Sequence, residues 1–181
     1  MLAAVDLREY PGAVPGALIA VVLALAVARW QNDDRRVQSG VAALLLLAAG
    51  LVLSVTLTPS GEALAGAATH RLVTCDVSRF TPLTPAALSR LTDESLNVYL
   101  FIPLGIAVAF LPASRWRLLC GLAAFLLPIV IETVQAVIPA LGRVCQSGDV
   151  VDNWTGLALG LAMGASAHAL WRTIATSSKA N

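Results

Sequence analysis

Charged residues are scarce in this sequence, and their scarcity argues against an ordinary soluble domain. Asp, Glu, Lys and Arg make up 13% of the 181 residues, whereas 57% are hydrophobic; soluble domains contain about 25% charged residues. The formal net charge is only +1, so the chain lacks the strongly basic balance that favours a nucleic-acid partner. Aromatic residues contribute 6%, and alanine and leucine carry most of the apolar content. This composition suits a compact helix bundle in lipid, where small residues let helices approach closely.

The sequence also lacks the common signatures of nucleotide, metal and hydrolase sites. It contains no phosphate-binding glycine loop, no HExxH and no GxSxG. The two histidines, His70 and His168, do not form a metal-binding pattern. Two acids that could share a divalent cation, Glu132 and Asp149, supply too few oxygen ligands to argue for one. We therefore predict no metal and no cofactor, and a nucleotide-driven pump is not expected.

Five stretches carry no charge or a single one, and each is close to the roughly 20 residues that cross the hydrocarbon core. Unpaired backbone is too costly in lipid, so each stretch should be helical. We predict transmembrane helices at residues 14–28, 41–57, 96–111, 118–138 and 154–171. Asp6 and Glu9 precede the first stretch in place of a basic region, which favours an uncleaved helix over a signal peptide. The predicted fold is an all-α, polytopic membrane bundle in one domain over residues 1–181.

The basic residues predict the orientation of this bundle, because cations concentrate in cytoplasmic connections. The first and third connections and the C-terminal tail contain seven cations and only two acids. These are Arg29, Arg35, Arg36, Arg115, Arg117, Arg172 and Lys179, with Asp33 and Asp34. We therefore expect the C-terminus in the cytoplasm and the N-terminus outside a bacterial cytoplasmic membrane. The long loop at residues 59–94, between the second and third helices, and the loop at residues 139–152 would also face outward.

Two of the three cysteines fall in these outer loops. The outer face of a bacterial membrane is oxidising, so Cys75 and Cys145 are predicted to form a disulfide. The alternative is that both thiols are unpaired and merely tolerated. A bridge across 70 positions would stabilise the fold by about 4 kcal/mol at most in chain-entropy models. Cys120, near the inner end of the fourth predicted helix, is most simply a small apolar residue.

A group of polar residues interrupts the apolar sequence near the predicted outer interface. Glu132 lies in the outer half of the fourth predicted helix, where an unpaired carboxylate would cost several kcal/mol. Gln135 follows one turn later on a neighbouring face. Asp149 would be favoured near the N-terminus of the fifth helix by the helix dipole. The complete group is Asn97, Glu132, Gln135, Arg143, Asp149 and Asn153, and we expect it to converge near the outer interface.

Each member of this group also has a purely structural interpretation. An ion pair between Glu132 and Arg143 would close the bundle without any ligand. The others could cap helix ends or join helices by hydrogen bonds: Asn97, Gln135, Asp149, Asp152 and Asn153. The functional interpretation rests on clustering, because two acids, two amides and a guanidinium fall within 22 residues of an otherwise apolar region.

The fifth predicted helix carries glycine at every fourth position. Gly156, Gly160 and Gly164 form two overlapping small-xxx-small repeats, which make a flat stripe for close helix contact. Packing within the chain is the favoured interpretation, and a homodimer face is the alternative. The sequence does not specify an oligomeric state.

Several motifs together resemble the VanZ-like family of bacterial membrane proteins, of the teicoplanin-resistance type. The first runs from Asn97 through Phe101 and Pro103 to Gly105, and the second is the Glu132–Gln135 pair. The third begins at Arg143 and continues with Asp149, Asn153, Gly156 and Gly160. With the Thr-Leu-Thr-Pro segment that starts at Thr56, the resemblance covers residues 56–160. One departure is Gln146, where many members have an additional Asp.

The resemblance implies a role in the cell envelope, and the namesake is associated with lowered sensitivity to teicoplanin. One hypothesis is that Asn97, Gln135, Arg143 and Asn153 bind a membrane lipid, a lipid-linked cell-envelope precursor with an anionic head group, or the glycopeptide antibiotic. The alternative is an enzyme acting on a lipid-linked intermediate. In that case Glu132 would be the general acid or base and Asp149 would orient the substrate. Whether the protein is an enzyme stays open at this stage.

Overall fold

The computed structural model describes residues 11–30, 36–66 and 74–177 of the chain, and within these residues it is helical. Its long helices are α1 (Ala13–Trp30), α2 (Arg36–Thr56), α5 (Asp93–Phe110), α6 (Arg115–Val137) and α7 (Ser147–Ser177). Its short elements are α3 (Gly61–Leu64), α4 (Pro85–Leu88) and the 3-10 turn η2 (Pro139–Leu141). The extended pairing in the described part is limited to one parallel bridge, between Asp76 and Gln146. The predicted all-α bundle is confirmed.

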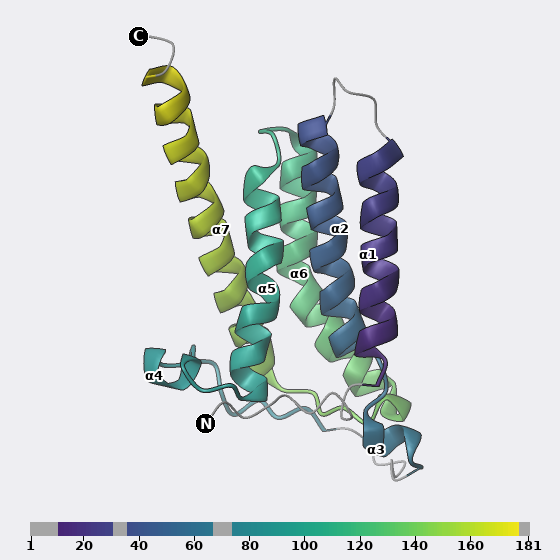
Figure 1. Ribbon diagram of the computed structural model, residues 1–181. Coiled ribbons are helices and arrows are strands. Elements are labelled where there is room, and N and C mark those ends of the chain that lie inside the picture. The colour runs from purple at the N-terminus through teal and green to yellow at the C-terminus, as the bar shows by residue number, and fades with distance from the viewer. Residues whose placement is uncertain (1–10, 31–35, 67–73, 178–181) are drawn as a thin grey trace.

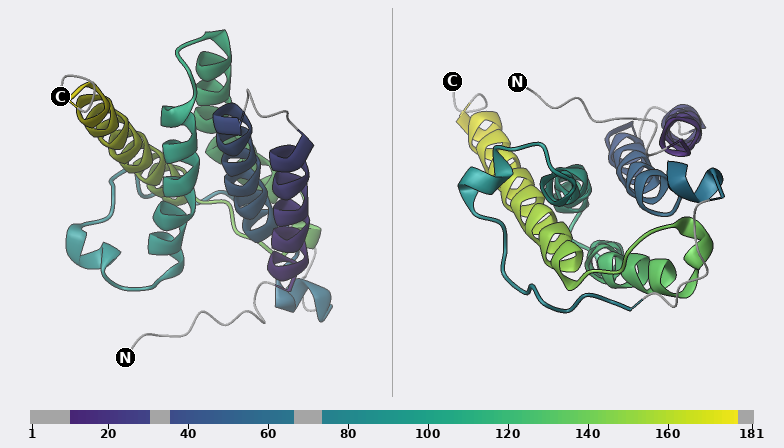
Figure 2. Two further views of the ribbon diagram at one scale, coloured as in Figure 1. Left: turned by 45° about the horizontal axis from the view of Figure 1, so that its top comes forward. Right: turned by 90° about the horizontal axis from the view of Figure 1, so that it is seen from below.

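The long helices run alternately in opposite directions, and the short elements gather at one end of the bundle (Figure 1). We call this the loop end. Seen along the bundle, α1 and α2 form a pair, and α5 stands between α2 and α7 (Figure 2). Because α5 contacts α2, α6 and α7, it is the central helix. The C-terminal part of α7 leans away from the other helices (Figure 1).

Three of the described helices are long and apolar enough to cross a membrane, at Ser39–Thr56, Asp93–Phe110 and Arg115–Val137. The apolar stretch of α1, Ala13–Arg29, is somewhat shorter. Apolar side chains cover the outer faces of these helices; Leu18, Val22 and Leu118 are more than half exposed. Such surfaces are stable in lipid, so the molecule is a helical membrane bundle. Five membrane crossings were predicted. Three of these helices, α2, α5 and α6, are long and apolar enough to cross a membrane, and α1 and α7 belong to the same bundle (Figure 1).

The fifth predicted helix was placed too short at both ends. We expected residues 154–171, whereas α7 spans Ser147–Ser177. The expectation followed the charge-free stretch, which begins after Asp152, although Asp149 was expected near the N-terminus of this helix. In the structure Asp149 and Asp152 lie within the first turns of α7. Other residues of the protein satisfy Asp152 there, as described below.

The orientation of the bundle in the membrane stays a prediction, and part of it rests on residues outside the described ones. Two of its arginines, Arg29 in the last turn of α1 and Arg115 at the start of α6, lie at the end of the bundle opposite the loop end (Figure 1). Of the charged residues in the prediction, Asp6, Glu9, Asp33, Asp34, Arg35 and Lys179 lie outside the described residues, as does His70. His168 makes an edge-on contact with Phe110 in α5.

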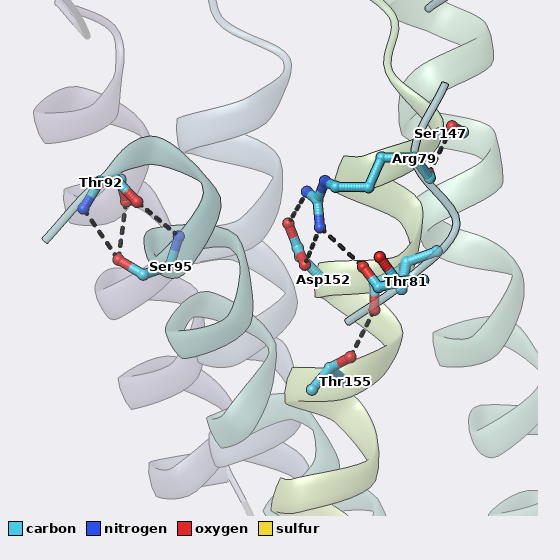
Figure 3. Close-up of polar contacts among 8 residues, drawn as sticks. Arg79, Thr81, Thr92, Ser95, Ser147, Asp152 and Thr155 are labelled. Carbon is cyan, nitrogen blue, oxygen red and sulfur yellow. Dashed lines mark hydrogen bonds and ion pairs between the residues drawn. The ribbon is translucent and has the colours of Figure 1, made fainter. Parts of the chain in front are cut away.

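Local sequence signals fix where α5 begins, and this start positions the polar group. Thr92 and Ser95 form a capping box, in which each side chain bonds the backbone N–H of the other (Figure 3). Such boxes satisfy donors that the helix itself leaves unpaired. The box places Asn97 in the first turns of α5, beside the N-terminal turns of α7.

Three glycines of α7 lie against α5: Gly156, Gly160 and Gly164. A β-carbon added at Gly156 would collide with the backbone carbonyl of Val98, and one added at Gly160 with that of Ile102. Gly105 in α5 approaches the backbone of α7 just as closely, at Leu157 and Leu161. The stripe therefore serves contact within the chain, and this contact holds the two polar helix starts together.

We expect the Gly160→Ala substitution to destabilise the protein, because the added methyl meets backbone atoms of Ile102 and Gly105. Overpacking of this kind costs about 1–3 kcal/mol. The matched control is Gly40→Ala in α2, where an added β-carbon meets nothing within 4 Å; alanine there should be neutral or stabilising by up to about 1 kcal/mol. Thermal unfolding in detergent compares the two. Equal midpoints for both variants would contradict the tight α5–α7 contact.

Candidate functional site

The six polar residues singled out in the sequence line one cavity at the loop end of the bundle. The cavity has a volume of about 1130 Å³, and its walls come from α2, α5, α6, α7 and the segment after η2. Asn97, Glu132, Gln135, Arg143, Asp149 and Asn153 all contribute to its lining. They come from four separate parts of the chain, so the fold brings together what the sequence spreads over 57 positions.

Glu132 is almost buried, with 6% of its surface exposed. Its Oε2 accepts a hydrogen bond of 2.7 Å from the backbone N–H of Gln146. Asp149 lies close enough for the two carboxylates to repel each other. The ion pair between Glu132 and Arg143 stays a prediction. A backbone amide therefore holds this carboxylate, and its position at the cavity wall leaves it in reach of a ligand.

Gln135 and Arg143 both bind the C-terminal end of α2. The Nε2 of Gln135 donates to the carbonyl of Thr56 at 2.9 Å, and a terminal guanidinium nitrogen of Arg143 donates to the carbonyl of Val55 at 2.9 Å. The last carbonyls of a helix lack partners within it, and a cation is favoured at that end by the helix dipole. These contacts join α6 and the following segment to α2, while both side chains still face the cavity.

Asn97 and Asp149 lie within hydrogen-bonding reach of each other, between the starts of α5 and α7. Asn153 follows one turn later and is 1% exposed. Its side-chain oxygen, Oδ1, has no hydrogen-bond partner. Buried polar atoms are nearly always paired, so an unpartnered acceptor on the wall of a cavity points to a donor that a ligand supplies.

The sequence analysis missed an ion pair that anchors the start of α7. Arg79, in the connection between α3 and α4, forms two hydrogen bonds with the carboxylate of Asp152, one of them 3.0 Å long (Figure 3). Asp152 is fully buried, and its hydrogen bonds raise the pKa of the Arg79 guanidinium. The available signal was Asp152 itself: a second acid one turn after Asp149, in an apolar helix, requires a cation from elsewhere.

The disulfide predicted between Cys75 and Cys145 is present, and Cys120 is free and half-buried. Backbone hydrogen bonds continue the link: Asp76 N–H donates to Cys145 at 2.9 Å, and Ser147 N–H donates to Asp76 at 2.8 Å. The Ser147 hydroxyl also bonds the carbonyl of Arg79. We call residues 74–84 the strap. It fixes the segment that contains Gln146, whose N–H binds Glu132.

The family follows from these observations together with one comparison. The model of the VanZ/LLP1 family matches residues 44–168, which include the disulfide, the strap and every polar residue of the cavity. The chain belongs to the VanZ/LLP1 family. No curated protein and no solved structure matches it. The resemblance inferred from the motifs is thereby confirmed, and their residues meet in one cavity of this VanZ-like protein.

No group of three or more His, Cys, Asp or Glu side chains in the described part of this VanZ-like protein is arranged to hold a metal ion. What the arrangement offers chemically is a buried set of carboxylate and amide acceptors, together with one guanidinium.

We expect one alkylated cysteine in the denatured, unreduced VanZ-like protein and three after reduction, because Cys75 and Cys145 form the disulfide and Cys120 is free. Intact mass measured with and without reductant counts the labels. An identical number of labels before and after reduction would show that the bridge does not form.

Arg79→Ala should strongly destabilise the protein, because it leaves the Asp152 carboxylate buried without its partner. Breaking a buried pair in this way costs about 3–5 kcal/mol. Adding Asp152→Asn to the Arg79→Ala variant should recover part of the loss, since a neutral amide is cheaper to bury. Arg90, an exposed arginine between α4 and α5, provides the control: Arg90→Ala should change stability by less than about 0.5 kcal/mol. Unfolding midpoints that fall equally for both arginine variants would exclude a special role for the pair.

Proposed function

We propose that this protein binds, at the outer face of the bacterial cytoplasmic membrane, the polar head group of a membrane lipid or lipid-linked cell-envelope precursor. The shape and lining of the cavity support this proposal. The polar residues occupy its loop end, whereas Ala48, Leu51, Leu100, Pro103 and Ile131 line the part that reaches into the bundle. Along α2 this apolar part extends from Thr56 to Ala48, about 12 Å of helix. A polar end joined to an apolar shaft fits an amphiphile.

Each polar side chain has a role in this proposal. Arg143 binds a phosphate or carboxylate of the head group, for which a guanidinium is well shaped. The side chains of Asn97, Gln135 and Asn153 bind amide or sugar groups. The loop end faces outward, with the N-terminus outside and the C-terminus in the cytoplasm, as the cations at the opposite end favour. A lipid-anchored glycopeptide antibiotic would suit the same cavity, and its capture would lower teicoplanin sensitivity.

The position of Glu132 favours one alternative, a membrane enzyme acting on a lipid-linked intermediate. The carboxylate lies at the cavity wall, almost buried and with Asp149 nearby. A carboxyl group in such surroundings is suited to transfer protons as a general acid or base. Asp149 would orient the substrate and Arg143 would stabilise developing negative charge.

Binding is tested by the lipid that accompanies the purified protein. Native mass spectrometry of detergent-extracted protein should show one lipid retained above its abundance in the membrane. Leu51→Trp, which fills the cavity from α2, should abolish this retention. Leu53→Trp makes the same change on the exposed face of α2 and should leave retention intact. Equal retention in both variants would mean that the lipid binds elsewhere and would refute the proposal.

Glu132→Gln separates the two functions, because it preserves the shape and the acceptor for Gln146 but removes the charge. If the protein is an enzyme, the retained lipid species should change from product to unprocessed substrate while the amount bound stays constant. If it only binds, the chemical identity of the bound lipid should be the same in both proteins. Lipid mass spectrometry of the two preparations decides between these outcomes.

A further inference from the structure

The lining of the cavity carries more negative than positive charge. Among its described residues, Asp93, Glu94, Glu132 and Asp149 are carboxylates, and Arg143 is the guanidinium. Asp93 and Glu94 are exposed at the mouth, whereas Glu132 is almost buried inside. A head group whose only charge is a phosphate would meet the one cation but also approach several anions. A purely anionic ligand is therefore poorly matched to this site.

The hydrogen-bonding groups of the cavity show the same preference. Asn153 is 1% exposed. Its side-chain oxygen, Oδ1, accepts no hydrogen bond from the protein. The carboxylate of Glu132 receives a single backbone hydrogen bond, although a carboxylate accepts up to four. Both residues line the cavity, so the missing donors would come from the ligand. Glu132 and Asn153 therefore offer acceptors to a ligand, and Arg143 offers donors in the same lining.

An ammonium group meets both requirements, since it brings three donors and one positive charge. We propose that the head group bound in this cavity carries a primary ammonium, held by Glu132, Asp149 and Asn153, while its phosphate lies toward Arg143. The ligand class is thus a zwitterionic aminophospholipid or a lipid with the same pairing of amine and phosphate. This inference rests on the proposed function and names the chemistry of the ligand.

Competition among lipids of identical acyl chains tests the inference without any variant. Delipidated protein in detergent is mixed with equal amounts of phosphatidylethanolamine, phosphatidylcholine and phosphatidylglycerol, and the bound species are counted by native mass spectrometry. We expect phosphatidylethanolamine to be favoured about tenfold, because its ammonium brings both N–H donors and a positive charge to the carboxylates, whereas phosphatidylglycerol donates only from neutral hydroxyls and adds a net negative charge. Phosphatidylcholine controls for charge, because its quaternary ammonium has no N–H donor.

Two variants, one double and one single, assign the preference to the cavity. The double variant Glu132→Gln with Asp149→Asn should bind the three lipids nearly equally. Asp76→Asn removes a carboxylate from the exposed strap, where it bonds the N–H of Ser78, and should leave the preference unchanged. Thermal unfolding of each variant confirms that it is folded.

The outcomes distinguish this inference from the proposed function. Equal binding of phosphatidylcholine and phosphatidylethanolamine, or a preference for phosphatidylglycerol, would overturn the ammonium site. If that binding were still abolished by Leu51→Trp, the proposed lipid-binding function would stand. If Leu51→Trp affected none of the three lipids, both would fall.

Discussion

Polar groups among membrane-spanning helices have no water to bind, so the protein itself must supply their partners. In this structure the partners come from distant parts of the chain. The final carbonyls of α2 receive donors from Gln135 and Arg143, and the fully buried Asp152 is bound by Arg79. These contacts cross between helices that otherwise meet through small apolar side chains. The need for partners therefore determines how the loop end is assembled, and Asn153 Oδ1 is a buried acceptor that the described residues leave unpaired.

The strap is what allows such partners to be held in place. A loop that crosses the end of a bundle loses much conformational freedom when its residues are ordered. Here the disulfide fixes the strap at Cys75, and the Arg79–Asp152 pair fixes it again four residues later. Between them lies the bridge that positions Gln146, whose N–H binds Glu132. The electrostatic environment of Glu132 thus depends on a loop more than 50 residues away in sequence.

The sequence predicted the parts of this arrangement that depend on local patterns. Charge-free stretches gave the long helices, and the spacing of Glu132 and Gln135 placed both on a buried side of α6. The disulfide was predicted because Cys75 and Cys145 both fall in outer loops. The Arg79–Asp152 pair was not predicted, because nothing local indicates which of several outer arginines reaches α7. The start of α7 was predicted too late, because its first turns carry acids and so fall outside the charge-free stretch that predicted the helix.

The side chain at position 146 bears on what the cavity does. Gln146 lines the cavity, and its backbone N–H binds Glu132. A Gln or an Asp side chain would preserve this backbone contact, but an Asp would add a further acceptor and a further negative charge beside Glu132. Because Gln146 is neutral, the carboxylates of Glu132 and Asp149 are the ones in the inner cavity on which the binding of a cationic group would depend.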